Sequence, residues 1–230
     1  MENWLNKFIK IIGSSVCHQI PERSFGANAL IMPVCSRCEG IYVGFFVSAI
    51  ILFLLFKKKE NELPPLYILI TMIVFVFSTI LEGAFGLFSI FQTNNISRFV
   101  TGYLAGSAAM VIIFPIFNYQ YYKDSITERI FLKPWKFIVF IGINIIIVVT
   151  ILLEIKALNY FFFYISFISV IFTFFYINLI LLLLIPFFSK KSFFLFSRHL
   201  ILPTVFSLIL TAIEIFISYR FHQFLLKLSF

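Results

Sequence analysis

The stretch GIYVGFFVSAIILFLLF, residues 40–56, contains no charged side chain and ends at three consecutive lysines, Lys57-Lys58-Lys59. A transmembrane helix needs roughly 20 predominantly apolar residues to cross the hydrocarbon of a bilayer. The stretch is slightly shorter than that, and the lysine run supplies the charge expected where a helix leaves the membrane. It therefore predicts a first transmembrane span.

Five further apolar runs follow and predict five further spans. Hydrophobic residues make up 61% of the chain and charged residues 12%, which is about half the usual share in soluble domains. The mean hydropathy is +1.04. We therefore predict an all-α, polytopic membrane protein of about six transmembrane helices with a short N-terminal arm. The predicted spans are residues 40–56, 66–85, 96–117, 137–153, 160–186 and 200–219.

The N-terminal arm holds the most reactive residues of the chain. Cys17 and His18 are adjacent, Cys35 and Cys38 form a C-x-x-C pair, and the sequence has no other cysteine. Thiolates and imidazole are the ligands of tetrahedral zinc sites, so these four residues predict a metal site, with zinc as the metal. Because adjacent residues seldom ligate one metal easily, an alternative is that Cys17 or His18 ligates while the other acts nearby.

Several charged or polar residues lie in or next to the spans, where each has an energetic cost and calls for a reason. Glu82 is near the end of the second span, and Asn95 and Arg98 share one face at the start of the third. Arg98 either pairs with Glu82 or clamps an anionic phosphate. Glu39 follows Cys38 directly. We treat Glu39, Glu82, Asn95 and Arg98 as candidate catalytic residues, and Arg23, Arg37 and Arg98 as candidate anion-binding residues.

An even number of spans places both chain ends on the same side as the cysteines, here called the motif side. The opposite side has ten basic residues and the motif side eight, or five (8 − 3) if the three candidate anion-binding arginines serve a site. The positive-inside rule then places the motif side outside the cytoplasm, in a plasma membrane. The basic residues of the opposite side are Lys57, Lys58, Lys59, Lys123, Arg129, Lys133, Lys136, Lys190, Lys191 and Arg198.

These residues resemble a family of small bacterial and archaeal membrane proteins known as domain of unknown function 2085. Its motifs are Cys-His-Gln-x-Pro-x-Arg-Ser-Phe and Cys-x-Arg-Cys-x-Gly-Ile-Tyr-x-Gly, which residues 17–25 and 35–44 match. An acidic-Gly pair, Asn-x-x-Arg and Thr-Gly follow in the family. The chain matches these motifs at Glu82-Gly83, Asn95 to Arg98 and Thr101-Gly102, although the acidic position is usually Asp.

The resemblance covers under half of the chain and implies a membrane protein with a metal or thiol site, without supplying an activity. It suggests a division into two parts. Residues 1–117 form a motif-bearing domain of the arm and three spans, and residues 118–230 form a three-span extension packed in the same bundle. We also expect a bacterial source.

Three classes of function remain open. The first is a zinc-binding membrane protein, in which the metal is structural or catalyses a reaction on a lipid or a phosphate-bearing substrate. The second is a thiol-disulfide redox protein that uses Cys35 and Cys38. The third is a small transporter or channel with Glu82 and Arg98 in its path. The more ordinary interpretations are a zinc or disulfide staple of the arm and a buried ion pair that sets helix register.

The net charge of +8 comes mostly from loops between the spans. In a membrane protein such charge reflects topology and contact with anionic lipid headgroups, and it does not indicate nucleic-acid binding. The lipid bilayer is therefore the expected partner, and the sequence does not predict an oligomeric state. The first fifteen residues do not resemble a cleaved signal peptide.

Overall fold

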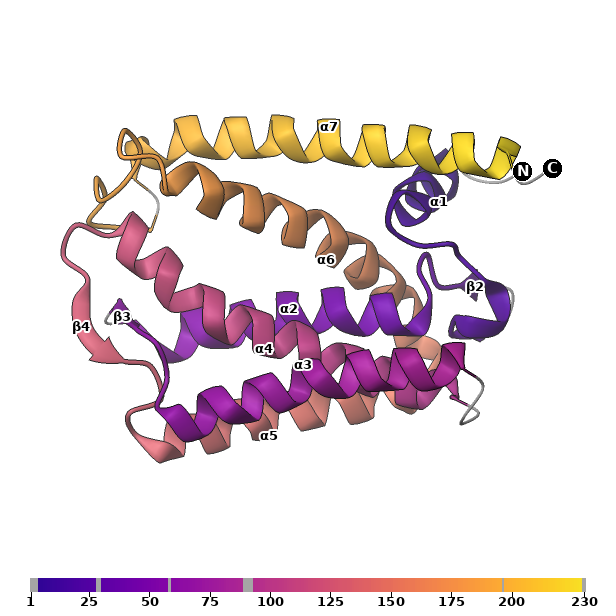
Figure 1. Ribbon diagram of the computed structural model, residues 1–230, viewed down its shortest axis with the longest axis horizontal. Coiled ribbons are helices and arrows are strands. Elements are labelled where there is room, and N and C mark those ends of the chain that lie inside the picture. Colours follow the sequence, from indigo (N-terminus) through magenta and orange to yellow (C-terminus); the bar gives the residue numbers. More distant parts are fainter. Residues whose placement is uncertain (1–3, 28–29, 58, 89–92, 196, 229–230) are drawn as a thin grey trace.

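The computed structural model describes residues 4–27, 30–57, 59–88, 93–195 and 197–228. Most of the described helices run along the long axis of the molecule (Figure 1). The helices are α1 (Trp4–Val16), α2 (Ser36–Leu55), α3 (Leu66–Leu87), α4 (Asn95–Tyr121), α5 (Pro134–Leu152), α6 (Lys156–Leu183) and α7 (Arg198–Leu228), with a 3₁₀ turn η1 (Pro21–Arg23). The short strands are β1 (Gly26–Ala27), β2 (Leu30–Ile31), β3 (Glu60–Glu62) and β4 (Ile126–Arg129).

Six of the described helices, α2 to α7, are long and apolar enough to cross a membrane. The prediction of a six-span, all-α membrane protein is therefore confirmed. The predicted ends shift by a few residues, and the largest consequence is at the first span. It starts at Ser36 instead of Gly40, with Cys35 as its N-cap, so the C-x-x-C pair belongs to the first turn of α2.

Helices α2 and α4 form the centre of the bundle through close backbone contact. A Cβ atom added to Gly40 would lie 2.3 Å from the carbonyl oxygen of Phe99, and one added to Gly106 would lie 2.0 Å from that of Ile41. Gly44 and Gly102 are equally crowded by the backbone of the facing helix. These close approaches hold α2 against α4, as small residues do in other membrane helix pairs.

The other spans surround this pair. Helix α3 packs on α4, α6 packs on α2, and α7 packs on α6. Asn144 of α5 accepts a hydrogen bond from the Tyr103 hydroxyl of α4 at 2.8 Å, in the middle of the bundle. The outward faces of α3, α5 and α7 carry exposed apolar side chains such as Val74, Ile138 and Phe216. Such faces fit contact with lipid tails.

The arm contains a helix, α1, that the sequence analysis did not predict. The Ser218 hydroxyl of α7 donates to the carbonyl of Ser15, and Phe8 meets Phe167 of α6 edge to face at 6.2 Å. Helix α1 lies near the C-terminal end of α7 (Figure 1). The arm is therefore anchored to the C-terminal part of the chain, at the motif side.

At the opposite end, two loops are joined. Strand β3 pairs in parallel with β4, and Lys59 bonds to the Asp124 carboxylate at 2.7 Å and 2.8 Å. This hydrogen bond lowers the pKa of Asp124. Lys136 reaches the buried Glu60 at 3.2 Å. These contacts tie the loop after α2 to the loop after α4 and to the first turn of α5.

Candidate metal centre

The turn after α1 brings the arm back towards the start of α2. Gln19 adopts a left-handed backbone conformation with φ of 51°, which reverses the chain directly after Cys17. Its side-chain amide donates to the carbonyls of Lys10 at 3.0 Å and Pro33 at 2.7 Å. Gly13 allows this approach, because a Cβ there would lie 2.0 Å from the Pro33 carbonyl oxygen. The Cys-His-Gln segment is thus clamped between α1 and the strand leading to α2.

Three sulfur atoms meet at this junction. The Sγ atoms of Cys17, Cys35 and Cys38 all lie within 4.8 Å of one another, and none of these cysteines is in a disulfide. The Cys17 sulfur also accepts backbone N–H groups from Cys35 at 3.2 Å and Gln19 at 3.5 Å. Backbone donors of this kind stabilise negative charge on sulfur, so the pocket suits thiolates.

The two cysteines outside the membrane spans differ in acidity. Hydrogen bonds from the thiols of Cys17 and Cys38 lower the pKa of Cys35, which also occupies the N-cap of α2. The pKa of Cys17 is raised, first because its thiol donates to the Cys35 sulfur and then because it is buried. The hydrogen bonds among the three thiols therefore favour the thiolate at Cys35 over the thiolate at Cys17.

His18 is not among the residues that the structure gathers around the sulfurs. Its side chain is exposed, and its ring meets the His222 ring of α7 edge to face with centroids 5.3 Å apart. The chain reversal at Gln19 explains this, because consecutive side chains leave a turn in different directions. Of the predicted set of four ligands, the structure brings together Cys17, Cys35 and Cys38.

Arg37, which lies between Cys35 and Cys38 in the sequence, links the cysteine cluster to the carboxylate of Glu82 in α3. Arg37 donates from both Nε, at 2.9 Å, and Nη2 to one oxygen of Glu82. Arg98 Nε lies 3.9 Å from the other oxygen of Glu82, and Arg98 also donates to the Thr93 hydroxyl at 2.7 Å. The expected pairing of Glu82 with Arg98 is present, but Arg37 is the closer partner. Two of the three predicted anion-binding arginines, Arg37 and Arg98, thus share the Glu82 carboxylate.

Asn95 and Arg23 lie beside this ion pair. The Asn95 side chain donates to the carbonyls of Glu22 at 3.3 Å and Ser24 at 3.4 Å. It therefore fastens the η1 turn to the start of α4, which is a positioning contact. Arg23 itself is exposed at the end of η1.

Three buried polar atoms near the cluster have no hydrogen-bond partner among the described residues. They are Ser36 Oγ, Glu39 Oε2 and Glu82 Oε1. Glu39 is only 1% exposed and follows Cys38 in the first turn of α2. Buried polar atoms are normally satisfied, so this region has unused capacity to bind water, an ion or a substrate.

Sequence reasoning missed two residues of this site. Gln19 was recognised only as part of a motif, although it positions the loop that carries Cys17. Ser36 was missed because it lies in the first turn of α2, which was predicted to begin four residues later. Ser36 followed three residues later by Glu39 matches the S-x-x-E pattern found at helix starts, and that signal could have placed the start of α2 near Ser36.

Taken together, six membrane-spanning helices and a triad of free cysteines at one end define a multi-pass membrane protein with a candidate thiolate site. The chain belongs to the family described as "Predicted membrane protein (DUF2085)", whose model matches residues 17–112. The match begins at the first cysteine and ends within α4, so it contains every candidate site residue.

Two uncharacterized proteins are similar to the chain. One, from Methanocaldococcus jannaschii, is 36% identical over 121 residues, which is 51% of this chain and 76% of that protein. The other, from Methanothermobacter thermautotrophicus, is 36% identical over 97 residues, which is 42% of this chain and 83% of that protein. No solved structure matches the chain. These relatives are archaeal, so the expectation of a bacterial source has no support from them.

Proposed function

We propose that the chain is a membrane metalloprotein that holds zinc on Cys17, Cys35 and Cys38 at the motif face. The convergence of three free sulfurs from two separate parts of the chain, the turn after α1 and the start of α2, is the observation that supports this most directly. Zinc–sulfur bonds of about 2.3 Å put the sulfurs of a tetrahedral site about 3.8 Å apart, so small shifts suffice to close the site. The Arg37 side chain, between two ligands, joins this centre to Glu82.

Three protein ligands leave one position of a tetrahedral zinc ion open, as in catalytic zinc sites. In the catalytic version of the proposal, that position activates water for a reaction on a lipid or phosphate-bearing substrate. Arg23 and Arg98 would hold the anion, and Glu39 or Glu82 would carry protons. The partly unsatisfied oxygens of both carboxylates support this assignment.

Metal analysis of the purified protein tests the proposal. We expect about one zinc per chain, with loss of the metal in Cys35→Ser and Cys38→Ser. His18→Ala is the matched control, since this side chain is exposed and lies outside the sulfur cluster. It should keep its zinc. Metal-free protein with all three thiols titratable would overturn the zinc centre, and zinc loss in His18→Ala would restore the four-ligand set.

A thiol redox function is the second candidate, and the lowered pKa of Cys35 favours it. A thiolate at a helix N-terminus in a C-x-x-C pair is typical of disulfide oxidoreductases. Zinc and a disulfide compete for the same sulfurs, so one measurement separates them. A redox protein would be isolated without zinc and with a Cys35–Cys38 disulfide that a mild dithiol reduces.

The location of the site is part of the proposal. We infer that the protein resides in the plasma membrane with its motif face outside the cytoplasm, on the basis of the lysine-rich loops of the opposite face. Anionic lipid headgroups are the expected neighbours of those loops.

A further inference from the structure

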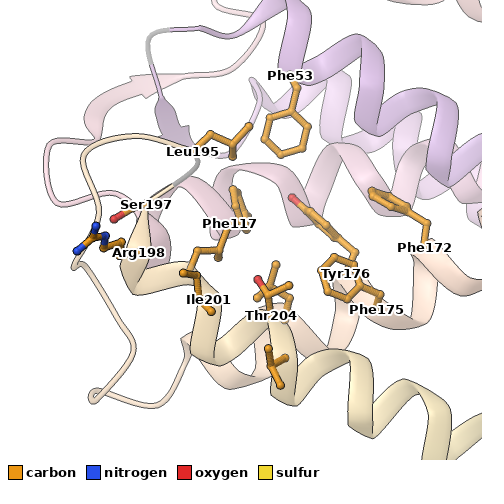
Figure 2. A pocket seen from close by; sticks show the side chains of 13 residues that line it. Phe53, Phe117, Phe172, Phe175, Tyr176, Leu195, Ser197, Arg198, Ile201 and Thr204 are labelled. Atoms are coloured by element: carbon orange, nitrogen blue, oxygen red, sulfur yellow. The ribbon is translucent and has the colours of Figure 1, made fainter.

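A large cavity lies between α6 and α7, at the opposite end of the bundle from the cysteines. It has a volume of about 600 Å³, within the roughly 300–1,000 Å³ of small-molecule sites. Aromatic and aliphatic side chains from α2, α4, α6 and α7 line it almost entirely (Figure 2). Such a lining favours a hydrocarbon chain over a polar metabolite.

A second, more polar cavity adjoins the first. It has a volume of about 250 Å³, and its lining includes Lys57, Lys59 and Asn118. Phe53 and Leu195 line both cavities, so the two hollows share a wall and are neighbours. One compartment is thus apolar and the other basic.

Charge around the pair of cavities is positive. Lys59 is partly neutralised by Asp124, but Lys57 is exposed and carries a second charge into the basic cavity. Arg198 adds a third charge at one edge of the apolar cavity (Figure 2). The three basic side chains face one carboxylate, that of Asp124. The site therefore has an excess of positive charge, which complements an anionic headgroup.

A buried polar atom points to an occupant of the apolar cavity. Tyr176 lines this cavity together with Phe53 and Phe117 (Figure 2). The residue is only 3% exposed, and its hydroxyl has no hydrogen-bond partner among the described residues. A buried hydroxyl normally finds a partner, and the ester or ether oxygen of a lipid is an acceptor that accompanies a hydrocarbon chain.

We propose that the two cavities form one binding site for an anionic lipid of the bilayer. The hydrocarbon chain lies between α6 and α7, and the headgroup lies at Lys57, Lys59 and Arg198. The site sits where the loops of the opposite face leave the membrane, which is the depth of lipid headgroups. It is separate from the cysteine cluster and does not depend on whether that cluster binds zinc.

Native mass spectrometry of the full chain tests this proposal with two probes that have identical acyl chains. Phosphatidylglycerol is the anionic probe and phosphatidylcholine the zwitterionic one. The wild type should retain phosphatidylglycerol preferentially. The double substitution Lys57→Gln and Arg198→Gln should weaken phosphatidylglycerol binding, by roughly fivefold for each charge removed, and leave phosphatidylcholine binding unchanged.

The matched control is Lys190→Gln with Lys191→Gln. These two lysines are on the same face, but their side chains lie over the rings of Tyr119 and Phe187, outside both linings. The control should bind phosphatidylglycerol as the wild type does. Equal loss in the control would show general surface attraction and overturn the site, as would equal retention of the two lipids by the wild type.

A third variant tests the apolar half alone. Thr204→Trp places a large ring in the cavity between α6 and α7 and should reduce binding of both lipids. If that variant does not fold, the smaller change Ile201→Phe replaces it, with an unchanged melting temperature as the criterion of folding. Undiminished binding in a folded variant would contradict a chain in this cavity.

Discussion

Cys35 differs from Cys17 in the direction of its pKa shift. Hydrogen bonds from neighbouring thiols lower its pKa, whereas the pKa of Cys17 is raised. A lowered pKa leaves Cys35 as thiolate throughout pH 6–8, so its alkylation rate in metal-free protein should stay nearly flat over this range. The rate at Cys17 should rise with pH, because the reactive thiolate forms only as pH approaches its pKa. Mass spectrometry of iodoacetamide adducts measures both rates.

The control for this prediction is the same protein loaded with zinc. Zinc on the sulfurs should protect Cys17 and Cys35 together, whatever the pH. Faster alkylation of Cys17 than of Cys35 at pH 6 would contradict the assignment of the thiolate.

The ion pair between Arg37 and Glu82 is the second feature at this scale. Glu82 is 9% exposed and Arg37 is 31% exposed, so removing one partner leaves a mostly buried charge unpaired. We expect Arg37→Gln to destabilise the protein by about 2–3 kcal/mol, below the roughly 3–5 kcal/mol of fully buried pairs because Arg98 still reaches Glu82. The melting temperature in detergent should fall accordingly.

A double-mutant cycle identifies the cause. Glu82→Gln should also destabilise, and the double variant Arg37→Gln/Glu82→Gln should lose less stability than the sum of the single changes. Strict additivity would mean that the two side chains act independently.

Among the elements, α2 and α4 determine how the site is assembled, since α2 carries Arg37 and Cys38 and α4 carries Arg98. Their contact depends on glycines. Gly106→Ala would put a methyl group 2.0 Å from a backbone oxygen of Ile41, so the helices must separate. We expect loss of folded protein, or a fall in melting temperature much larger than for an ordinary surface change. Size-exclusion chromatography with a thermal melt measures it.

Gly142 is the matched control in α5. A Cβ there meets nothing within 4 Å, so Gly142→Ala should be neutral or slightly stabilising, by up to about 1 kcal/mol. Equal damage from the two substitutions would contradict a specific role for the α2–α4 contact.

The elements show which features a sequence can predict. Long apolar runs identified all six spans, because hydrocarbon thickness sets their length. Helix α1 was missed because it has no long apolar run, and its contacts with α6 and α7 join residues about 150–200 positions apart.

The site was predictable in part for a related reason. Residue type alone predicted one ligand set of Cys17, His18, Cys35 and Cys38, because thiolates and imidazole are soft metal ligands, and the structure brings the three cysteines of this set together. The direction of His18 depends on the backbone turn at Gln19, and the partner of Arg37 depends on where α2 begins. A local sequence pattern specifies neither the direction of the His18 side chain nor the partner of Arg37.

At the scale of the whole molecule, the two candidate sites lie at opposite ends of the bundle. The end with the cysteines also carries Glu39, Glu82 and Arg98. The other end carries the lysine-rich loops and the paired cavities between α6 and α7. Helices that span a membrane keep these ends on different sides, so the orientation of the bundle decides which compartment each site meets.

Reporter fusions in a bacterial host test that orientation. The C-terminal end of α7 lies beside the arm that carries Cys17, because Ser218 donates to Ser15 and His222 meets His18. If the motif face is outside the cytoplasm, alkaline phosphatase fused to the C-terminus should be active, because it needs an oxidising compartment to form its disulfides. Green fluorescent protein at that position should be dark.

A fusion after Ser125 provides the internal control, because this residue lies in the loop between α4 and α5 on the opposite face. It should give the reverse result, with an inactive phosphatase and a fluorescent protein. Reversal of both fusions would place the cysteines in the reducing cytoplasm, where thiols stay free for zinc, and would weaken the redox candidate. The same result at both positions would contradict the even number of spans. The experiment therefore tests the topology and discriminates between the two proposed functions of the cysteine cluster.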